Sequence, residues 1–226
     1  MNILESLFIT MRPYRFWRMA IIFVPVIFSG NFFNFIMLLK LLTAYLIFSL
    51  LTGAINIIDD IADIKQDKNH PLKRTLPVAS GEISINKAEF SVGIILIGAF
   101  FAAFFFGPYF GATALAYFLI ELIYYLSLKR VQIIDILCIA AESSLLLLAG
   151  TILSNHYISS WLFIFVLMMS IFFALNERKR RIILNLEGAD SQPEYDKSVL
   201  DQLISITGAS AIIIYVLFAI ISSEGQ

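Results

Sequence analysis

The sequence predicts an all-α fold, a multi-span transmembrane helix bundle of about seven helices, and two observations lead to this prediction. First, 59% of the 226 residues are hydrophobic and only 15% are charged, with a mean hydropathy of +0.85. A soluble domain of this length cannot bury so much apolar surface, so the bilayer must solvate much of it. Second, the apolar residues form continuous runs without the alternation typical of barrel strands, which leaves helices as the spanning structure.

Seven segments approach the length of about 20 apolar residues that a spanning helix needs. They are Phe16–Phe33, Phe35–Ile58, Ala88–Phe106, Tyr109–Ser127, Ile133–Leu153, Ser160–Leu175 and Val199–Ser222. The first of them is too long for a signal peptide and lacks a small-residue cleavage pattern. We therefore expect one membrane domain over residues 1–226, with no separate soluble domain.

The basic residues predict how the bundle is oriented. Fifteen of the sixteen lysines and arginines fall in segments that alternate helices place on one side, and only Lys40 falls at the other end. By the positive-inside rule, the N-terminus and these segments are cytoplasmic and the C-terminus is outside. We expect the membrane to be a bacterial-type inner (plasma) membrane. The formal net charge of −1 gives no argument for a nucleic-acid partner. The single cysteine, Cys138, excludes an internal disulfide and disfavours a thiolate metal site.

An acidic cluster follows the second apolar segment and predicts a metal site. It consists of Asp59, Asp60, Asp63 and Asp67. On a continuous helix the last three would share one face, where their charges repel unless a cation lies among them. Ligands that are all oxygens suit Mg²⁺ or Mn²⁺, and Mg²⁺ is commonly shared with substrate phosphates. The alternative is a solvated helix end whose carboxylates pair with neighbouring lysines.

Basic side chains follow this cluster at a short distance. Lys73 and Arg74 carry donors and no acceptors, which suits them to phosphate oxygens. An ordinary cytoplasmic loop of a membrane protein would show the same two residues.

The stretch from Asp59 to Gly81 resembles the first aspartate-rich motif of the UbiA superfamily of intramembrane prenyltransferases. It is most similar to the polyprenyl-phosphate phosphoribosyltransferase branch, whose motif reads N-D-x-x-D-x-x-x-D-x-x-H-P-x-K-R-x-R-P-x-A-x-G. The matching residues are Asp60, Asp63, Asp67, His70, Pro71, Lys73, Arg74, Pro77, Ala79 and Gly81. The sequence departs from the motif at Asp59, in place of asparagine, and at Leu76, in place of arginine.

Other segments extend the resemblance over most of the chain. They are Arg12-Pro13 with Arg18, Tyr124 to Lys129 with Asp135, Ala149-Gly150, and the basic run Arg178 to Arg181, whose register is open. Leu146 stands where the branch has an arginine, and Glu142 lies one turn earlier inside an apolar segment. An intramembrane carboxylate is by default a functional hypothesis. Glu142 could bind a cation or a basic side chain, or remain a protonated acid inside the bundle.

The resemblance implies a Mg²⁺-dependent transferase that uses a polyisoprenoid lipid and a pyrophosphate-containing donor at the cytoplasmic side. In the branch, phosphoribosyl pyrophosphate is the donor and a polyprenyl phosphate is the acceptor. The implied catalytic and metal-binding residues are Asp60, Asp63 and Asp67, with Asp59 as a further metal ligand. The implied phosphate-binding residues are Lys73, Arg74, Lys129, Arg18, Arg178 and Lys179. Tyr124, Asp135 and Glu142 are further candidate site residues.

Two other functions remain open from the sequence. One is an aromatic prenyltransferase that uses a prenyl pyrophosphate at the same aspartates. The other is a degenerate lipid-binding membrane protein without catalysis. The superfamily has nine helices, whereas this sequence predicts seven, so we expect a shortened enzyme, a truncated product, or a bundle completed by oligomerisation.

Overall fold

A computed structural model describes residues 3–28, 34–69, 73–128, 131, 134–155, 159–183 and 196–224. Within these ranges every regular element is helical, which confirms the all-α prediction. The elements are α1 (Ile3–Thr10), η1 (Pro13–Phe23), α2 (Val24–Phe28), α3 (Phe35–Ala62), α4 (Ile64–Asp67), η2 (Lys73–Thr75), α5 (Ile85–Phe105), α6 (Pro108–Ile123), η3 (Tyr124–Leu128), α7 (Ile134–Ser154), α8 (Ser160–Ile183) and α9 (Lys197–Glu224).

Six helices in the described part of the chain are long and apolar enough to cross a membrane. They are α3, α5, α6 continued by η3, α7, α8 and α9. They correspond to the last six of the seven predicted segments, and the chain is an integral membrane protein.

The first predicted segment, Phe16–Phe33, does not form one long α-helix, and this corrects the prediction. Its chain forms the 3₁₀ helix η1 followed by the short helix α2, and positions 29–33 lie outside the described residues. A 3₁₀ helix rises about 2.0 Å per residue, against about 1.5 Å in an α-helix, so η1 and α2 together are about 30 Å long. Sixteen residues therefore reach about the thickness of the hydrocarbon core.

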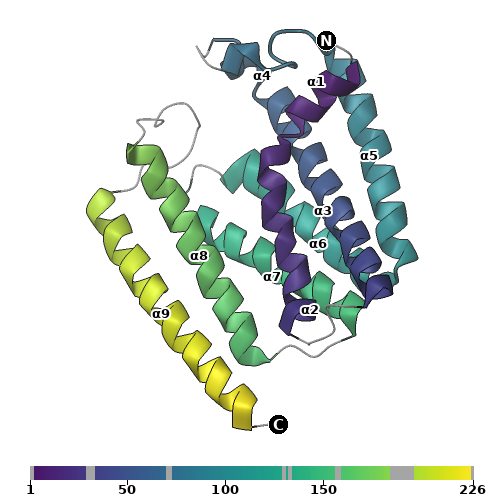
Figure 1. The fold of residues 1–226 in the computed structure, drawn as a ribbon. Helices are drawn as coiled ribbons and strands as arrows, with labels where there is room; N and C mark the ends of the chain where they lie inside the picture. The colour runs from purple at the N-terminus through teal and green to yellow at the C-terminus, as the bar shows by residue number, and fades with distance from the viewer. Residues whose placement is uncertain are drawn as a thin grey trace.

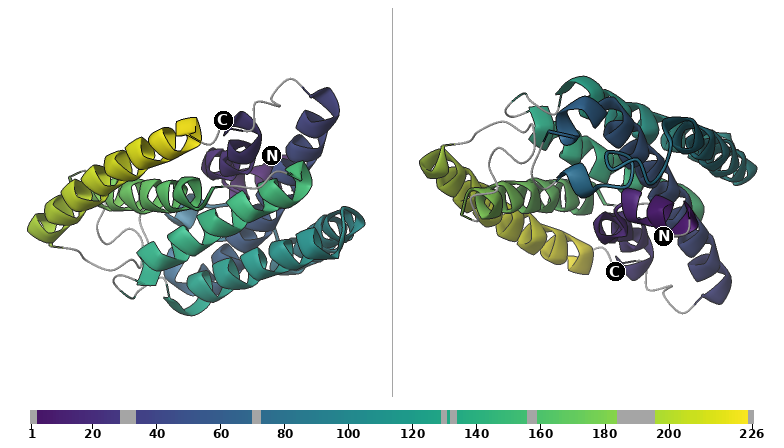
Figure 2. Two further views of the ribbon diagram at one scale, coloured as in Figure 1. Left: turned by 90° about the horizontal axis from the view of Figure 1, so that it is seen from below. Right: turned by 90° about the horizontal axis from the view of Figure 1, so that it is seen from above.

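The helices are arranged around η1 and α7 (Figure 1). η1 lies against α3 and α7, α6 contacts α5 and α7, and α8 contacts α7 and α9. α9 lies at the outer edge of the bundle with α8 as its main neighbour, as the views from both ends show (Figure 2). Of these six spans α7 is the most buried and α9 the least: 44% and 11% of the residues in their 18-residue apolar stretches are buried. The interior of the bundle therefore lies around η1, α3, α6 and α7.

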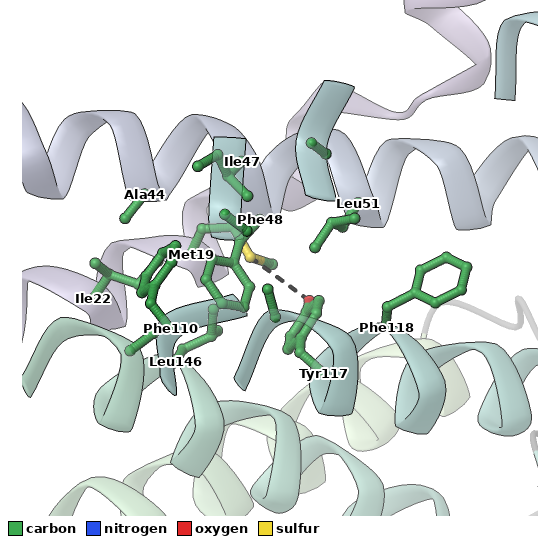
Figure 3. Close-up of a cluster of buried hydrophobic side chains, with 14 of the residues drawn as sticks. Met19, Ile22, Ala44, Ile47, Phe48, Leu51, Phe110, Tyr117, Phe118 and Leu146 are labelled. Carbon is green, nitrogen blue, oxygen red and sulfur yellow. Dashed lines mark hydrogen bonds between the residues drawn. The ribbon is translucent and has the colours of Figure 1, made fainter. Parts of the chain in front are cut away.

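Large apolar side chains fill this interior (Figure 3). Phe48 of α3 makes edge contacts with Phe110 and Tyr117 of α6, at centroid distances of 5.9 and 5.0 Å. Met19 of η1 accepts a hydrogen bond from the Tyr117 hydroxyl at 3.6 Å. Leu146 of α7 closes the cluster. This packing holds η1 against three spanning helices.

Cysteine labelling in intact vesicles, both inverted and right-side-out, tests the orientation of the bundle. We expect it to place the N-terminus on the cytoplasmic side. In a Cys138→Ser background, a cysteine at exposed Asn86, before the first turn of α5 is complete, should react only from the cytoplasmic side. One at exposed Ser159, before α8, should react only from outside, because the basic residues gather at the end of the bundle that holds Asn86. The reverse labelling pattern would refute this orientation.

Candidate functional site

The acidic cluster lies where α3 ends. α3 stops at Ala62, Asp63 leaves the helical conformation with φ −90° and ψ 5°, and α4 begins at Ile64. The expectation of one continuous helical face for Asp60, Asp63 and Asp67 is therefore wrong, because Asp63 interrupts the helix. Asp60 and Asp67 are still buried, with 2% and 4% of their surface exposed, and Asp63 is half-buried. The charges of Asp59 and Asp67 both act on Asp60.

Three arginines of the N-terminal segment bind polar side chains of the neighbouring helices. A 3₁₀ helix has three residues per turn, so Arg15 and Arg18, three apart within η1, lie on one face, and Arg12 immediately precedes the helix. Below we call these three side chains the arginine ladder. Arg12, which precedes η1 with a left-handed φ of 54°, donates from Nη2 to Asp60 Oδ1 at 2.5 Å. Its Nη1 lies 3.9 Å from Asp59 Oδ2.

The second step of the ladder reaches one turn deeper into the bundle. Arg15 donates to Asn56 Oδ1 at 3.2 Å and to the Tyr125 hydroxyl. Asn56 in turn donates from Nδ2 to the Met11 carbonyl oxygen at 3.0 Å, which joins α3 to the start of the N-terminal segment. Arg12, Arg15, Asn56 and Tyr125 were not among the predicted site residues. For Arg12 and Arg15, the regular spacing of three residues in the sequence was the available signal.

The third step lies inside the membrane span of α7. Arg18 donates from Nη2 to Glu142 Oε2 at 2.7 Å, and only 2% of the Glu142 side chain is exposed. Of the options left open for Glu142, the structure thus shows a basic side chain as its partner. Nearby, Thr52 donates to Glu121 at 3.0 Å and lies 2.8 Å from the Tyr117 hydroxyl.

A further ion pair, together with a hydrogen bond, joins three predicted site residues from separate helices. Arg178 of α8 donates from Nε to Asp135 Oδ2 at 2.7 Å, and its Nη2 lies 2.7 Å from the same oxygen. The Arg178 Nη2 also donates to the Tyr124 hydroxyl at 3.4 Å. Asp135 is fully buried at the start of α7. This cluster links η3, the start of α7 and α8.

Of the remaining predicted phosphate ligands, the structure describes the side chains of Lys179 and Arg74. Lys179 lies 2.7 Å from Asp201 Oδ1 of α9, and Arg74 is exposed in η2. Lys129 and His70 lie outside the described residues, as does the side chain of Lys73. Three of the six predicted phosphate ligands, Arg18, Arg178 and Lys179, are thus paired with the protein's own carboxylates.

The acidic cluster fits a cation that is shared with substrate and does not fit a metal enclosed by protein. In the described part of the chain, no three side chains of His, Cys, Asp or Glu lie close enough together to hold a metal ion by themselves. However, Asp60 Oδ2 is buried and has no hydrogen-bond partner among the described residues. Such an oxygen is costly unless it finds a ligand. Mg²⁺ needs only one or two carboxylates when phosphates and waters complete its shell.

Two curated proteins illustrate how similar this chain is to known sequences. An uncharacterized protein of Sinorhizobium fredii is 31% identical over 168 residues, which cover 74% of this chain and 33% of that protein. The decaprenyl-phosphate phosphoribosyltransferase of Mycolicibacterium smegmatis is 23% identical over 184 residues, covering 80% of this chain and 58% of that protein. The chain thus spans between a third and somewhat more than half of the length of these curated relatives.

Solved structures support the fold. A UbiA homolog from Archaeoglobus fulgidus, bound to GPP and Mg²⁺, superposes with a TM-score of 0.77 at 15% identity, covering 94% of this chain and 77% of that one. The UbiA prenyltransferase family profile matches residues 17–177. This span includes the aspartate motif, α7 and most of α8, and it confirms the resemblance seen in the motif. The chain therefore belongs to the UbiA prenyltransferase family.

Proposed function

We propose that this chain is a Mg²⁺-dependent membrane transferase that moves phosphoribose from phosphoribosyl pyrophosphate to a polyprenyl phosphate, with release of pyrophosphate. The observation that carries the proposal is the buried Asp60, which has one unpartnered oxygen and lies against the arginine ladder at the end of a UbiA-family bundle. The His70-to-Gly81 extension of the motif and the similarity to decaprenyl-phosphate phosphoribosyltransferases favour the phosphoribosyl donor.

The carboxylates and the arginines have complementary tasks in this proposal. Asp60, Asp63 and Asp67 would hold the cation, with Asp59 next to them. When bound, Mg²⁺ neutralises the charge that develops on the leaving pyrophosphate oxygens. Arg12 keeps the Asp60 carboxylate oriented by binding Oδ1, which leaves Oδ2 free for a ligand. A guanidinium has five N–H donors, so Arg12 can bind Asp60 and a phosphate oxygen together.

The proposed reaction needs no nucleophile from the protein. A polyprenyl phosphate already carries an anionic oxygen, which attacks the sugar carbon that the pyrophosphate leaves. The bond from that oxygen to the carbon forms as the bond from the carbon to the pyrophosphate oxygen breaks. The protein's contribution is to bring the two anionic substrates together, for which cationic side chains are required.

The direct test uses purified protein in detergent with Mg²⁺, a polyprenyl phosphate and one donor at a time. We expect pyrophosphate release with phosphoribosyl pyrophosphate and none after chelation of the metal. A protein that ignores this donor but joins a prenyl pyrophosphate to an aromatic acid would instead be an aromatic prenyltransferase, which the GPP-bound structural neighbour makes the second candidate. Absence of turnover with every donor would overturn both.

Replacing Arg74 by alanine should raise the KM for phosphoribosyl pyrophosphate, with less effect on the KM for the lipid. The donor carries a second phosphate on its sugar, and Arg74 is an exposed cation that follows the acidic cluster in the chain. Loss of one charge-assisted bond to phosphate costs about 1.5–3 kcal/mol, or roughly ten- to a hundred-fold in KM. Steady-state kinetics would measure this, with Lys87→Ala, an exposed basic residue of α5, as the matched control. Equal effects of Arg74→Ala on both substrates would count against the assignment.

A further inference from the structure

The 3₁₀ geometry of η1 divides this segment into three faces with different surroundings. Tyr14, Trp17 and Ala20 are exposed, and they form the outward face. Met19 and Ile22 are buried in the bundle, and Phe16, three residues before Met19, is half-buried. The arginine ladder forms the third face and is half-buried. Exposure thus repeats every three residues, as expected for three residues per turn.

This arrangement depends on the helix type. In an α-helix a step of three residues falls about 60° short of a full turn, so Arg15 and Arg18 would point about 60° apart. In η1 these two side chains instead share one direction, with Arg15 bound to Asn56 and Arg18 bound to Glu142. Because runs of 3₁₀ helix beyond three or four residues are uncommon, an eleven-residue one needs contacts that hold it.

Two contacts with α7 supply such a constraint. At Gly150 the backbones nearly touch, because a Cβ there would lie 2.2 Å from the Ile22 carbonyl oxygen. Two turns earlier on α7, Glu142 accepts the hydrogen bond from Arg18. The first contact fixes how closely η1 approaches α7. The second fixes its rotation, since moving Arg18 away would leave a buried carboxylate without its cation.

We propose that Arg18 and Glu142 are positioning residues that hold η1 in its three-residue turn, so that Arg12 and Arg15 face Asp60 and Asn56. The inference rests on the proposed function only for its kinetic consequence. Arg12 and Arg15 lie nearer the acidic cluster than Arg18 does. Arg18 therefore has a different role and acts on the site through the backbone of η1. Glu121, the other carboxylate near this pair, already accepts a hydrogen bond from Thr52.

The rotation of η1 can be read without any substrate. The chain has two tryptophans, so Trp161→Phe leaves Trp17, which is 63% exposed, as the only one. In vesicles of dibrominated phosphatidylcholine, Trp17 on the outward face should be strongly quenched. We expect Glu142→Gln to reduce this quenching and the exchange Arg18→Glu with Glu142→Arg to restore it. Asp201→Asn, which breaks an ion pair between α8 and α9, should leave the quenching unchanged.

The kinetic arm should follow the same order. Glu142→Gln should raise the KM for phosphoribosyl pyrophosphate about tenfold, because two donors leave their positions, and the charge exchange should recover most of it. Unchanged quenching in folded Glu142→Gln, or lost quenching in a folded charge-exchanged protein, would overturn the inference. If Glu142→Gln fails to fold, the charge-exchanged protein decides alone. Restored quenching in a protein with no transferase activity would sustain the positioning role and reject the proposed function.

Discussion

Replacing Asp60 by asparagine should reduce turnover by about a thousand-fold or more while the protein still folds. The change removes one buried carboxylate charge, and on the proposed mechanism that charge holds the cation. Loss of such a ligand costs on the order of 4 kcal/mol of transition-state stabilisation. Folding should survive because the asparagine oxygen can still accept the hydrogen bond that Arg12 donates to Oδ1. Pyrophosphate release over a range of Mg²⁺ concentrations would measure the effect.

Three further variants make this result specific. Asp63→Asn should also inactivate the enzyme, since it belongs to the same predicted ligand set. Asp59→Asn should cost less, because the family motif that the sequence resembles has asparagine at that position. Glu89→Gln neutralises an exposed carboxylate of α5 and serves as the matched control for charge removal. Full activity with an unchanged Mg²⁺ dependence in Asp60→Asn would show that the acidic cluster is not the metal site.

Replacing Arg178 by methionine should lower the stability of the bundle by about 3–5 kcal/mol. Arg178 binds Asp135, whose side chain is fully buried, and also contacts Tyr124. Removing the guanidinium takes this cation away from a fully buried carboxylate, which costs more than the pair itself contributes. Methionine keeps most of the apolar stem of the side chain, so packing changes little. Thermal unfolding of the detergent-solubilised protein would give the comparison.

The double variant Arg178→Met with Asp135→Leu tests the cause. It removes both charges, so most of the lost stability should return, because an apolar pair of similar volume is commonly as stable as a buried ion pair. Asp201→Asn breaks the more exposed pair with Lys179 and should change stability by less than about 1 kcal/mol. A double variant as unstable as Arg178→Met would show that Arg178 acts through packing and not through the charge of Asp135.

Much of this protein follows from its sequence alone, because the relevant signals are local. Long apolar runs require helices in a bilayer whatever their neighbours are, and six of the seven predicted spans are helices of spanning length. The aspartates and the basic residues after them lie within 23 residues of chain from Asp59 to Gly81, so a motif of fixed spacing identifies the family. The expectation that Glu142 has a partner also follows locally, since a carboxylate inside an apolar run is costly without one.

Tertiary packing decides the features for which local signals are weak or absent. The sequence between Pro13 and Phe23 predicts a helix, whereas its three residues per turn appear only in the structure, where the segment packs against α3 and α7. Helix type in turn decides which arginines share a face, and hence that Arg15 meets Asn56 and Arg18 meets Glu142, 41 and 124 residues away. The break of α3 at Asp63 likewise could not be predicted from a glycine or proline, because neither residue occurs there. Partners so distant in sequence are chosen by the packing of whole helices, which no single segment specifies.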